Sequence, residues 1–341
     1  MQSIHEVLKL RTPQIWGTQL LIATNLLVFL AMLADGAGFW HSPNGIQLAW
    51  GANFGPATQD GQWWRLGSAI FLHFGVIHLA LNMWSLWDAG QLVERMYGHF
   101  RFICIYFISG LFGNLASLVI QGNIAVSGGA SGAIFGIYGA LLVFLWLARS
   151  EVTSHEFRWL FWGALAFASI TIVLGFIISG IDNSAHIGGF ISGILASLVF
   201  SKSTYIKRIS VQISWLSIGI LIFTTSILIF NLPAPKYRWS DEILIRKEID
   251  AFLYRDQEIN RSWLEVIYEG KQGEKTFDAL ANQIDTGISN RYEESFEKLS
   301  QLPANAALPS AAKLAKILQY VQHRKDESKA VAEKLRQQDH Q

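Results

Sequence analysis

Seven apolar runs follow one another along the first part of the chain. They lie near residues 17–35, 66–88, 101–121, 130–148, 159–179, 185–201 and 211–232. An α-helix needs about 20 apolar residues to cross a bilayer, and only the sixth run, which is short and rich in glycine, gives a weak signal. The runs do not alternate as barrel strands would, and an open sheet cannot satisfy its backbone in lipid. The pattern therefore predicts seven transmembrane helices.

The pattern changes at Pro233 and Pro235, where charged residues become frequent. Ser240 and Asp241 are typical of a helix N-cap, and apolar residues then recur at helical spacing. These are Ile245, Ile249, Phe252 and Leu253. We expect three to five helices in this region, followed by a polar tail after about Arg324.

The composition agrees with an all-α, polytopic membrane protein that carries a soluble helical domain. Of the 341 residues, 51% are hydrophobic and 16% are charged, whereas soluble domains average about 25% charged residues. A net charge of +1 argues against nucleic-acid binding. The single cysteine, Cys104, excludes an intrachain disulfide. The region after Lys236 shows no set of metal ligands. No metal or organic cofactor is expected.

The basic residues of the short connections predict the orientation. Nine lie on one side, namely Lys9, Arg11, Arg95, Arg101, Arg149, Arg158, Lys202, Lys207 and Arg208. The opposite connections contain only Arg65. Because cytoplasmic loops are enriched in Lys and Arg, we expect a cytoplasmic N-terminus and, after seven spans, an extracytoplasmic C-terminus.

A serine at the start of the fourth run is a candidate nucleophile. Ser131 lies between Gly129 and Gly132, where free N–H groups and the helix dipole would suit an oxyanion. The alternative is ordinary helix packing, because Gly128, Gly132 and Gly136 form a stripe of small residues.

A histidine in the sixth run is the candidate base. Gly188, Gly189 and Gly193 follow His186 and would let its helix approach the fourth helix closely. That approach would bring His186 to Ser131 as a nucleophile–base pair for acyl transfer. A packing role or a proton path is the alternative.

The second run contributes a third group of polar residues. His78 and Asn82 are four residues apart and share one helix face, so with the Ser131 N–H they could line an oxyanion hole. His73 lies nearer the outside and could hold water or the helix end. A structural polar seam between helices is the alternative.

Three strings, HFGVIHLALN, GASG and AHIGG, occur in this order on alternate helices and resemble the rhomboid intramembrane serine proteases. The Trp64-Arg65 and Glu94-Arg95 pairs agree with this resemblance, as does the Gly189-xxx-Gly193 spacing. The resemblance covers roughly residues 15–202.

The resemblance implies that Ser131 and His186 form a dyad without an acidic third member, although Asp182 precedes the sixth run. It also implies an oxyanion hole made by His78, Asn82 and the Ser131 N–H. The loop from Gly36 to Trp64 would dip into the membrane interface. Supporting positions are His73, Gly129, Gly132, Phe135 and Gly189. Phe135 is a departure, because many relatives have tyrosine there.

The expected organisation has four parts: a cytoplasmic tail (1–14), a six-helix catalytic core (15–202), a linker with the seventh helix (203–232) and an extracytoplasmic helical domain (233–341). No charged residue is expected deep within a span, which argues against a transporter.

The expected function is serine endopeptidase cleavage of transmembrane segments near the outer face of a bacterial inner membrane. Its partners would be transmembrane protein substrates and the lipid bilayer, with no nucleic acid. A catalytically inactive relative that binds membrane proteins is the main alternative. The partner of the C-terminal domain is left open.

Overall fold

The structure is a computed structural model that describes residues 3–201, 210–273 and 275–339. It is 77% helical, and its described residues contain no β-strand, only one antiparallel bridge between Asn53 and Ser127. The chain divides into two compact units, Met1–Pro235 and Lys236–Gln341. The linker expected over 203–209, with Lys202, lies outside the described residues.

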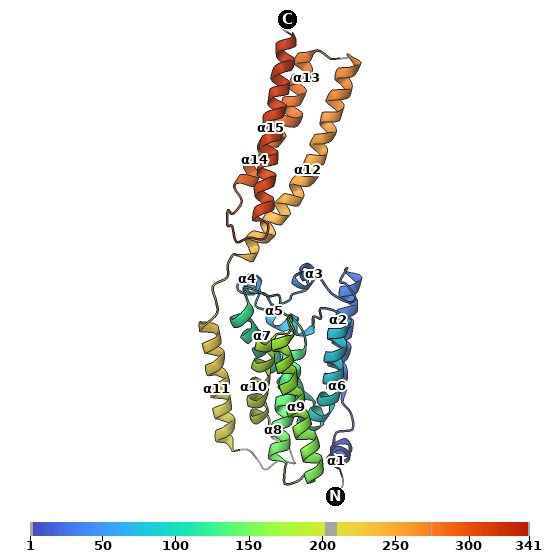
Figure 1. The fold of residues 1–341 in the computed structure, drawn as a ribbon, viewed down its shortest axis with the longest axis vertical. Coiled ribbons are helices and arrows are strands. Elements are labelled where there is room, and N and C mark those ends of the chain that lie inside the picture. Colours follow the sequence, from blue (N-terminus) through green and yellow to red (C-terminus); the bar gives the residue numbers. More distant parts are fainter. Residues whose placement is uncertain (1–2, 202–209, 274, 340–341) are drawn as a thin grey trace. The chain divides into compact units, whose positions relative to one another are not determined.

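The first unit is a helix bundle (Figure 1). Its elements are α1 (Ile4–Arg11), α2 (Trp16–Ala34), α3 (Asn44–Ala49), α4 (Gly55–Thr58), α5 (Arg65–Ser68), the 3₁₀ turn η1 (Ala69–Phe71), α6 (Val76–Tyr97), α7 (His99–Gln121), α8 (Ser131–Leu147), α9 (Ser154–Ile177), α10 (Asn183–Val199) and α11 (Val211–Phe230). Six of the seven predicted apolar runs each correspond to one helix, namely α2 and α7 to α11, whereas the second run is divided between α5, η1 and α6. The all-α class is therefore confirmed.

Four of these helices, α2, α7, α9 and α11, are long and apolar enough to cross a membrane. A fifth span arises if the bent pair of Arg65–Phe71 and Val76–Tyr97 is counted as one. The apolar helices α8 and α10 each have 17 residues and are therefore only about 25 Å long. Both begin at residues singled out above, Ser131 and the segment before His186.

The second apolar run, expected as one span over 66–88, bends by 91° before α6 begins at Val76. The bend is fixed by a close approach of the chain at Phe39–Ser42. Val76 N donates to Phe39 O at 2.9 Å, Ser42 N donates to Phe74 O at 2.8 Å, and a side chain at Gly75 would collide with the Trp40 carbonyl.

Because of the bend, α6 begins only at Val76 and continues past the predicted run to Tyr97. Asp88 consequently lies within α6, more than two turns from either end. The expectation that no charged residue lies deep within a span is wrong for this residue. Hydropathy placed Asp88 at the edge of a span because it could not detect the bend.

Glycines let α7, α8 and α10 pack backbone against backbone. A methyl group at Gly189 would collide with the Gly132 carbonyl, and one at Gly193 would collide with Gly136. A methyl group at Gly113 of α7 would lie 2.7 Å from the Ala185 carbonyl oxygen. This contact sets α8 and α10 side by side along the faces that carry Ser131 and His186.

A buried carboxylate joins α2 to α6 at the other end of the bundle. Glu94 accepts the backbone N–H groups of Gly17 and Thr18, both at 2.7 Å, and the Thr18 hydroxyl at 2.6 Å. These are free amides of the first turn of α2, where a negative charge is stabilising. His99 also contacts this carboxylate, and Arg95 donates to the Thr12 carbonyl. The Glu94-Arg95 pair thus anchors the start of α2.

The described residues of the second unit form four α-helices and one π-helical turn. They are α12 (Trp239–Gln272), α13 (Phe277–Ile284), the π-turn η2 (Asp285–Ser289), α14 (Asn290–Ser300) and α15 (Ala311–Asp339). The predicted apolar positions Ile245, Ile249 and Phe252 are buried. The segment expected as a polar tail after Arg324 instead continues α15, and it buries Ser328 and Ala332.

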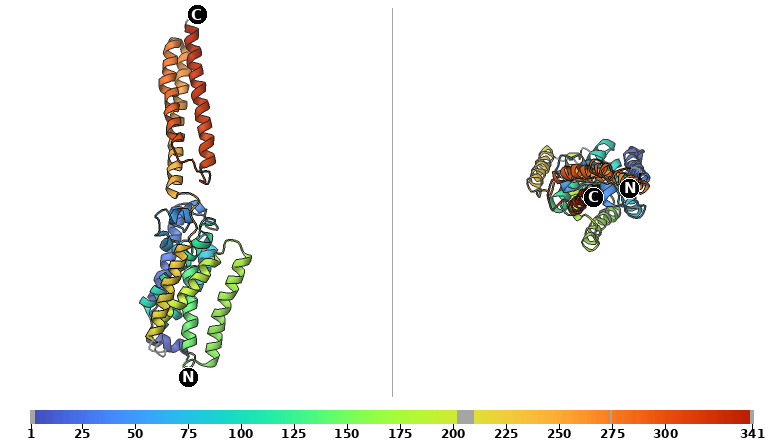
Figure 2. Two further views of the ribbon diagram at one scale, coloured as in Figure 1. Left: turned by 90° about the vertical axis from the view of Figure 1, so that its left-hand side faces the viewer. Right: turned by 90° about the horizontal axis from the view of Figure 1, so that it is seen from above.

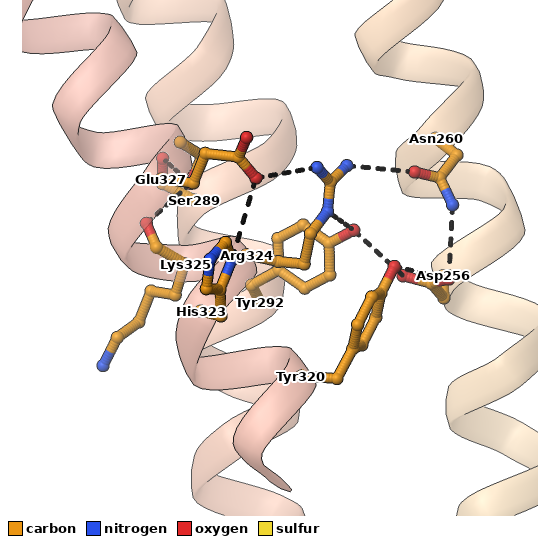
Figure 3. A network of polar contacts seen from close by, with 10 residues as sticks. Asp256, Asn260, Ser289, Tyr292, Tyr320, His323, Arg324, Lys325 and Glu327 are labelled. Atoms are coloured by element: carbon orange, nitrogen blue, oxygen red, sulfur yellow. Dashed lines mark hydrogen bonds and ion pairs between the residues drawn. The ribbon is translucent and has the colours of Figure 1, made fainter. Parts of the chain in front are cut away.

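Polar residues connect α12, α14 and α15 inside this unit (Figure 3). Tyr292 donates to Asp256 at 2.9 Å, and Tyr320 donates to the same carboxylate at 3.2 Å. Arg324 reaches Asn260 at 3.1 Å and Tyr292 at 3.3 Å. Burial raises the pKa of the Tyr292 hydroxyl, and Asp256 raises it further against a lowering by Arg324, so the hydroxyl stays protonated as a donor.

Candidate active site

Ser131 is the first residue of α8, and the segment before it is fixed by hydrogen bonds. Ser127 and Asn53 exchange both backbone hydrogen bonds at 2.9 Å, and Gly129 N donates to Ala69 O at 2.8 Å. Gly129 has φ of 140°, which disfavours any other residue. Ser131 is half-buried, and the amides of the first turn of α8 have no intrahelical acceptor.

His186 lies one turn inside α10 and is 5% exposed. Its imidazole stacks on the Phe135 ring, with centroids 4.3 Å apart and planes inclined by 8°. A methyl group at Gly132 would lie 3.2 Å from the Ala185 carbonyl oxygen, so the residue after Ser131 adjoins the residue before His186. The structure therefore brings the two candidate dyad residues onto adjoining turns of α8 and α10.

His78 and Asn82 lie one turn apart near the start of α6. The His78 ring lies against Gly129, where a methyl group would be 2.8 Å from Cε1 and 2.9 Å from Nε2. Asn82 donates one amide hydrogen to the His78 carbonyl at 2.9 Å, which leaves its second amide hydrogen available. Phe74 N approaches His78 Nδ1 at 3.4 Å and orients the ring.

His73 is fully buried and packs edge-on to His78, with ring centroids 5.0 Å apart. Within the described residues, neither of its ring nitrogens has a hydrogen-bond partner. Its carbonyl accepts from Gln47 Nε2 at 2.9 Å, which ties it to α3. His73 thus lies beside His78, a candidate oxyanion donor, and has two buried ring nitrogens without partners among the described residues.

Asp182, which precedes the helix of His186, accepts hydrogen bonds from several segments around the candidate dyad. As N-cap of α10 it accepts Ala185 N at 3.1 Å, and it also accepts the Ser127 hydroxyl at 2.7 Å. Two side chains of α7, Ser117 and Gln121, donate to the same carboxylate. The His186 Nδ1 atom has no hydrogen-bond partner among the described residues, so Asp182 binds the segments around the dyad and not the imidazole.

The loop between α2 and α5 is held by buried polar contacts. Arg65 is 4% exposed and donates to the Leu48 and Ala52 carbonyls at 2.8 and 3.1 Å. Asn114 of α7 donates to the Leu66 carbonyl at 2.7 Å. In contrast, Trp40, Trp63 and Trp64 are exposed, as residues at a membrane interface would be.

Comparisons with known proteins agree with this geometry. The rhomboid domain model matches residues 60–203. Rhomboid protease GluP of Bacillus subtilis (strain 168) is 40% identical over 180 residues, which are 53% of this chain and 34% of GluP. Putative rhomboid protease YdcA of the same organism is 36% identical over 51% of this chain and 82% of its own length. Rhomboid protease AarA of Providencia stuartii is 27% identical over 68% of this chain and 89% of its own length.

The helix bundle, the apolar helices and these matches define an integral, multi-pass membrane protein. The chain belongs to the rhomboid family. It spans about a third of the length of GluP and most of the length of YdcA. Among the described residues, no group of three or more His, Cys, Asp or Glu side chains could hold a metal ion.

Proposed function

We propose that this protein is an intramembrane serine endopeptidase in which Ser131 is the nucleophile and His186 is the general base. The observation that carries the proposal is the glycine-mediated contact of α8 with α10, which sets Gly132 against Ala185 and stacks Phe135 on His186. A buried imidazole next to a serine at a helix N-terminus is the arrangement that nucleophilic acyl transfer requires.

The chemistry follows from the positions of the donors. Neutral His186 takes the proton of the Ser131 hydroxyl as the oxygen attacks a peptide carbonyl, and then gives that proton to the leaving amine. The charge that develops on the carbonyl oxygen is met by the Ser131 N–H, His78 and Asn82. Water then attacks the acyl-enzyme with His186 again as the base. His73 and Ser127 are polar groups that would retain this water.

The substrate is a transmembrane segment of another protein. A helix hides its carbonyls in its own hydrogen bonds, so the segment must unwind locally before Ser131 can attack. We therefore expect residues that weaken helices near the cleavage site and small side chains at the scissile bond. No metal or organic cofactor takes part in this mechanism.

The direct test is cleavage of a detergent-solubilised single-span reporter by wild type, Ser131→Ala and His186→Ala. Both variants should lose all cleavage, and the double variant should be no worse, because neither residue acts without the other. Ser226→Ala, on α11, is the matched control and should cleave normally. Strong cleavage by Ser131→Ala would refute the serine mechanism. Tight reporter binding without cleavage by wild type would favour an inactive membrane-protein binder.

The orientation proposed from the basic residues places the site toward the outer face of a bacterial inner membrane. A reporter enzyme active only outside the cytoplasm should then work when fused after Lys236 and fail when fused after Lys202. The reverse pattern would invert the orientation and move the site to the cytoplasmic side.

A further inference from the structure

Asp88 is an exposed carboxylate within α6. It lies on the exposed face of α6 that also carries Ile77, Leu81 and Trp84, at spacings of three and four residues. Residues at that spacing form one stripe along a helix. An ionisable side chain inside a membrane helix is costly, so a functional partner is the first hypothesis.

The stripe faces the seam between α6 and α9. Trp84 contacts Phe167 of α9 edge-on, with ring centroids 6.5 Å apart, and Phe167 stacks on Tyr138 of α8 at 4.5 Å. Tyr138 in turn interacts electrostatically with Asp88. Asp88 therefore belongs to a cluster built by three helices.

Little of α9 is covered by the rest of the described protein. Only 11% of the apolar stretch of α9 is buried, against 50% for α7. Figure 2 shows α9 set to one side of the bundle. A transmembrane segment approaching the dyad from the membrane therefore meets less packing along α9 than among α7, α8 and α10.

The pairing of Asp88 is incomplete within the protein. A carboxylate has about four acceptor sites, and Tyr138 offers one O–H. In the described part of the chain, no basic side chain forms an ion pair with Asp88. Glu94 on the same helix, by contrast, has both oxygens occupied by α2. The remaining acceptor sites of the Asp88 carboxylate would bind a positively charged hydrogen-bond donor most strongly.

We propose, on the basis of the proposed function, that Asp88 and Tyr138 form a subsite that binds a Lys or Arg side chain of the substrate's transmembrane segment. Such a residue is as costly in lipid as Asp88, and pairing the two relieves both costs. The subsite therefore selects segments with a basic residue at a set distance from the scissile bond.

The distance follows from α8, which carries both Ser131 and Tyr138. Tyr138 is seven residues after Ser131 on α8, which corresponds to about 10 Å. A substrate strand extends about 3.3 Å per residue, and a helix rises about 1.5 Å per residue. The basic residue should thus lie about three residues from the scissile bond if that stretch is extended, and about seven if it stays helical.

The test is a scan of one single-span reporter in proteoliposomes. Lys is placed at each position from two to eight residues on the inner side of the cleavage site, and Met of similar length is the reference. In wild type, kcat/KM should favour Lys over Met by roughly 10-fold at one or two adjacent positions. Asp88→Asn should abolish that preference, and Asp250→Asn, an exposed acid of the second unit, should retain it.

Charge reversal supplies the second arm. Asp88→Lys should prefer a Glu reporter to a Lys reporter at the same position. Fluorophosphonate labelling of Ser131 and thermal unfolding show whether each Asp88 variant keeps a folded site. If an Asp88 variant is damaged, Tyr138→Phe is used in its place and should weaken the Lys preference. A flat scan in wild type, or an unchanged preference in Asp88→Asn, overturns the subsite alone. Failure of wild type to cleave any reporter above the level of Ser131→Ala overturns the proposed function as well.

Discussion

Asn82 and His78 lie one turn apart on α6, and His78 lies beside Gly129, so we propose them as the side-chain donors to the oxyanion. We expect Asn82→Ala to lower kcat by roughly 10- to 1,000-fold, because one donor of several is lost, and to change KM less. The measurement is reporter kinetics in detergent, with Asn231→Ala at the end of α11 as the control. An Asn82→Ala protein that is folded but as inactive as Ser131→Ala would assign Asn82 a different role.

Asp182 connects the two segments that carry the candidate dyad, since it accepts Ser127 four residues before Ser131 and caps the helix of His186. Asp182→Ala should lower kcat more than KM, by roughly 10-fold or more, because the loss of its charge-assisted hydrogen bonds, the one from Ser127 among them, loosens the position of the serine segment. Asp182→Asn keeps a capping oxygen and should recover much of the activity.

The Ser127→Ala variant tests the same contact from the other side. Its effect should be contained in that of Asp182→Ala and should not add to it, because both variants remove the Ser127–Asp182 hydrogen bond. Additive losses, or losses that follow thermal stability alone, would mean that Asp182 is only a helix cap.

Single residues differ in how far the sequence predicts them. Ser131, His78, Asn82 and His186 stand out because polar groups are rare in apolar runs, and their catalytic roles remain predictions. The role of Asp182 is not evident from the sequence, because its donor Ser127 is 55 residues away in the chain and no local pattern reveals that pairing.

At the scale of helices, glycine residues determine how closely α8 and α10 approach each other. A side chain at Gly189 would collide with the Gly132 backbone, which cannot move aside as a flexible side chain could. Gly189→Ala should therefore destabilise the bundle by about 1–3 kcal/mol or more and sharply reduce cleavage. In a matched position, Gly163 of α9 has nothing within 4 Å of an added methyl group.

Thermal unfolding in detergent separates the two cases. Gly163→Ala should leave the melting temperature unchanged or raise it, because Ala favours a helix over Gly by up to about 1 kcal/mol. Equal melting temperatures for the two variants would contradict the close packing of α8 on α10.

Hydropathy located the apolar helices of the described residues but not every helix boundary. The second apolar run is continuous in sequence, yet hydrogen bonds between Phe39–Ser42 and Phe74–Val76 break it at Gly75. Such contacts join residues more than 30 positions apart, so a window average cannot detect them. The same bend carries Asp88 into the interior of α6, and the proposed subsite depends on it.

In the whole molecule, the second unit has its own interior and is joined to the first through the segment after α11. The periodicity of Ile245, Ile249 and Phe252 predicted its first helix, whereas the contacts of Asp256 with Tyr292 and Tyr320 join distant positions. Every candidate catalytic residue lies in the first unit. We propose that the second unit is an accessory module that concentrates substrates or limits their access.

Truncation tests this division directly. A chain that ends at residue 238 lacks α12 to α15 but keeps the segment after α11, where Gln59 and Asn123 donate to the Pro233 and Ala234 carbonyls at 3.0 and 2.8 Å. Because those contacts and the candidate site persist, we expect a generic single-span reporter to be cleaved within a few-fold of the full-length rate, with altered choice among natural substrates. Expression and melting are measured alongside. A truncated protein that folds yet cleaves nothing would show that the second unit takes part in catalysis, whereas one that fails to fold would assign it a role in stability.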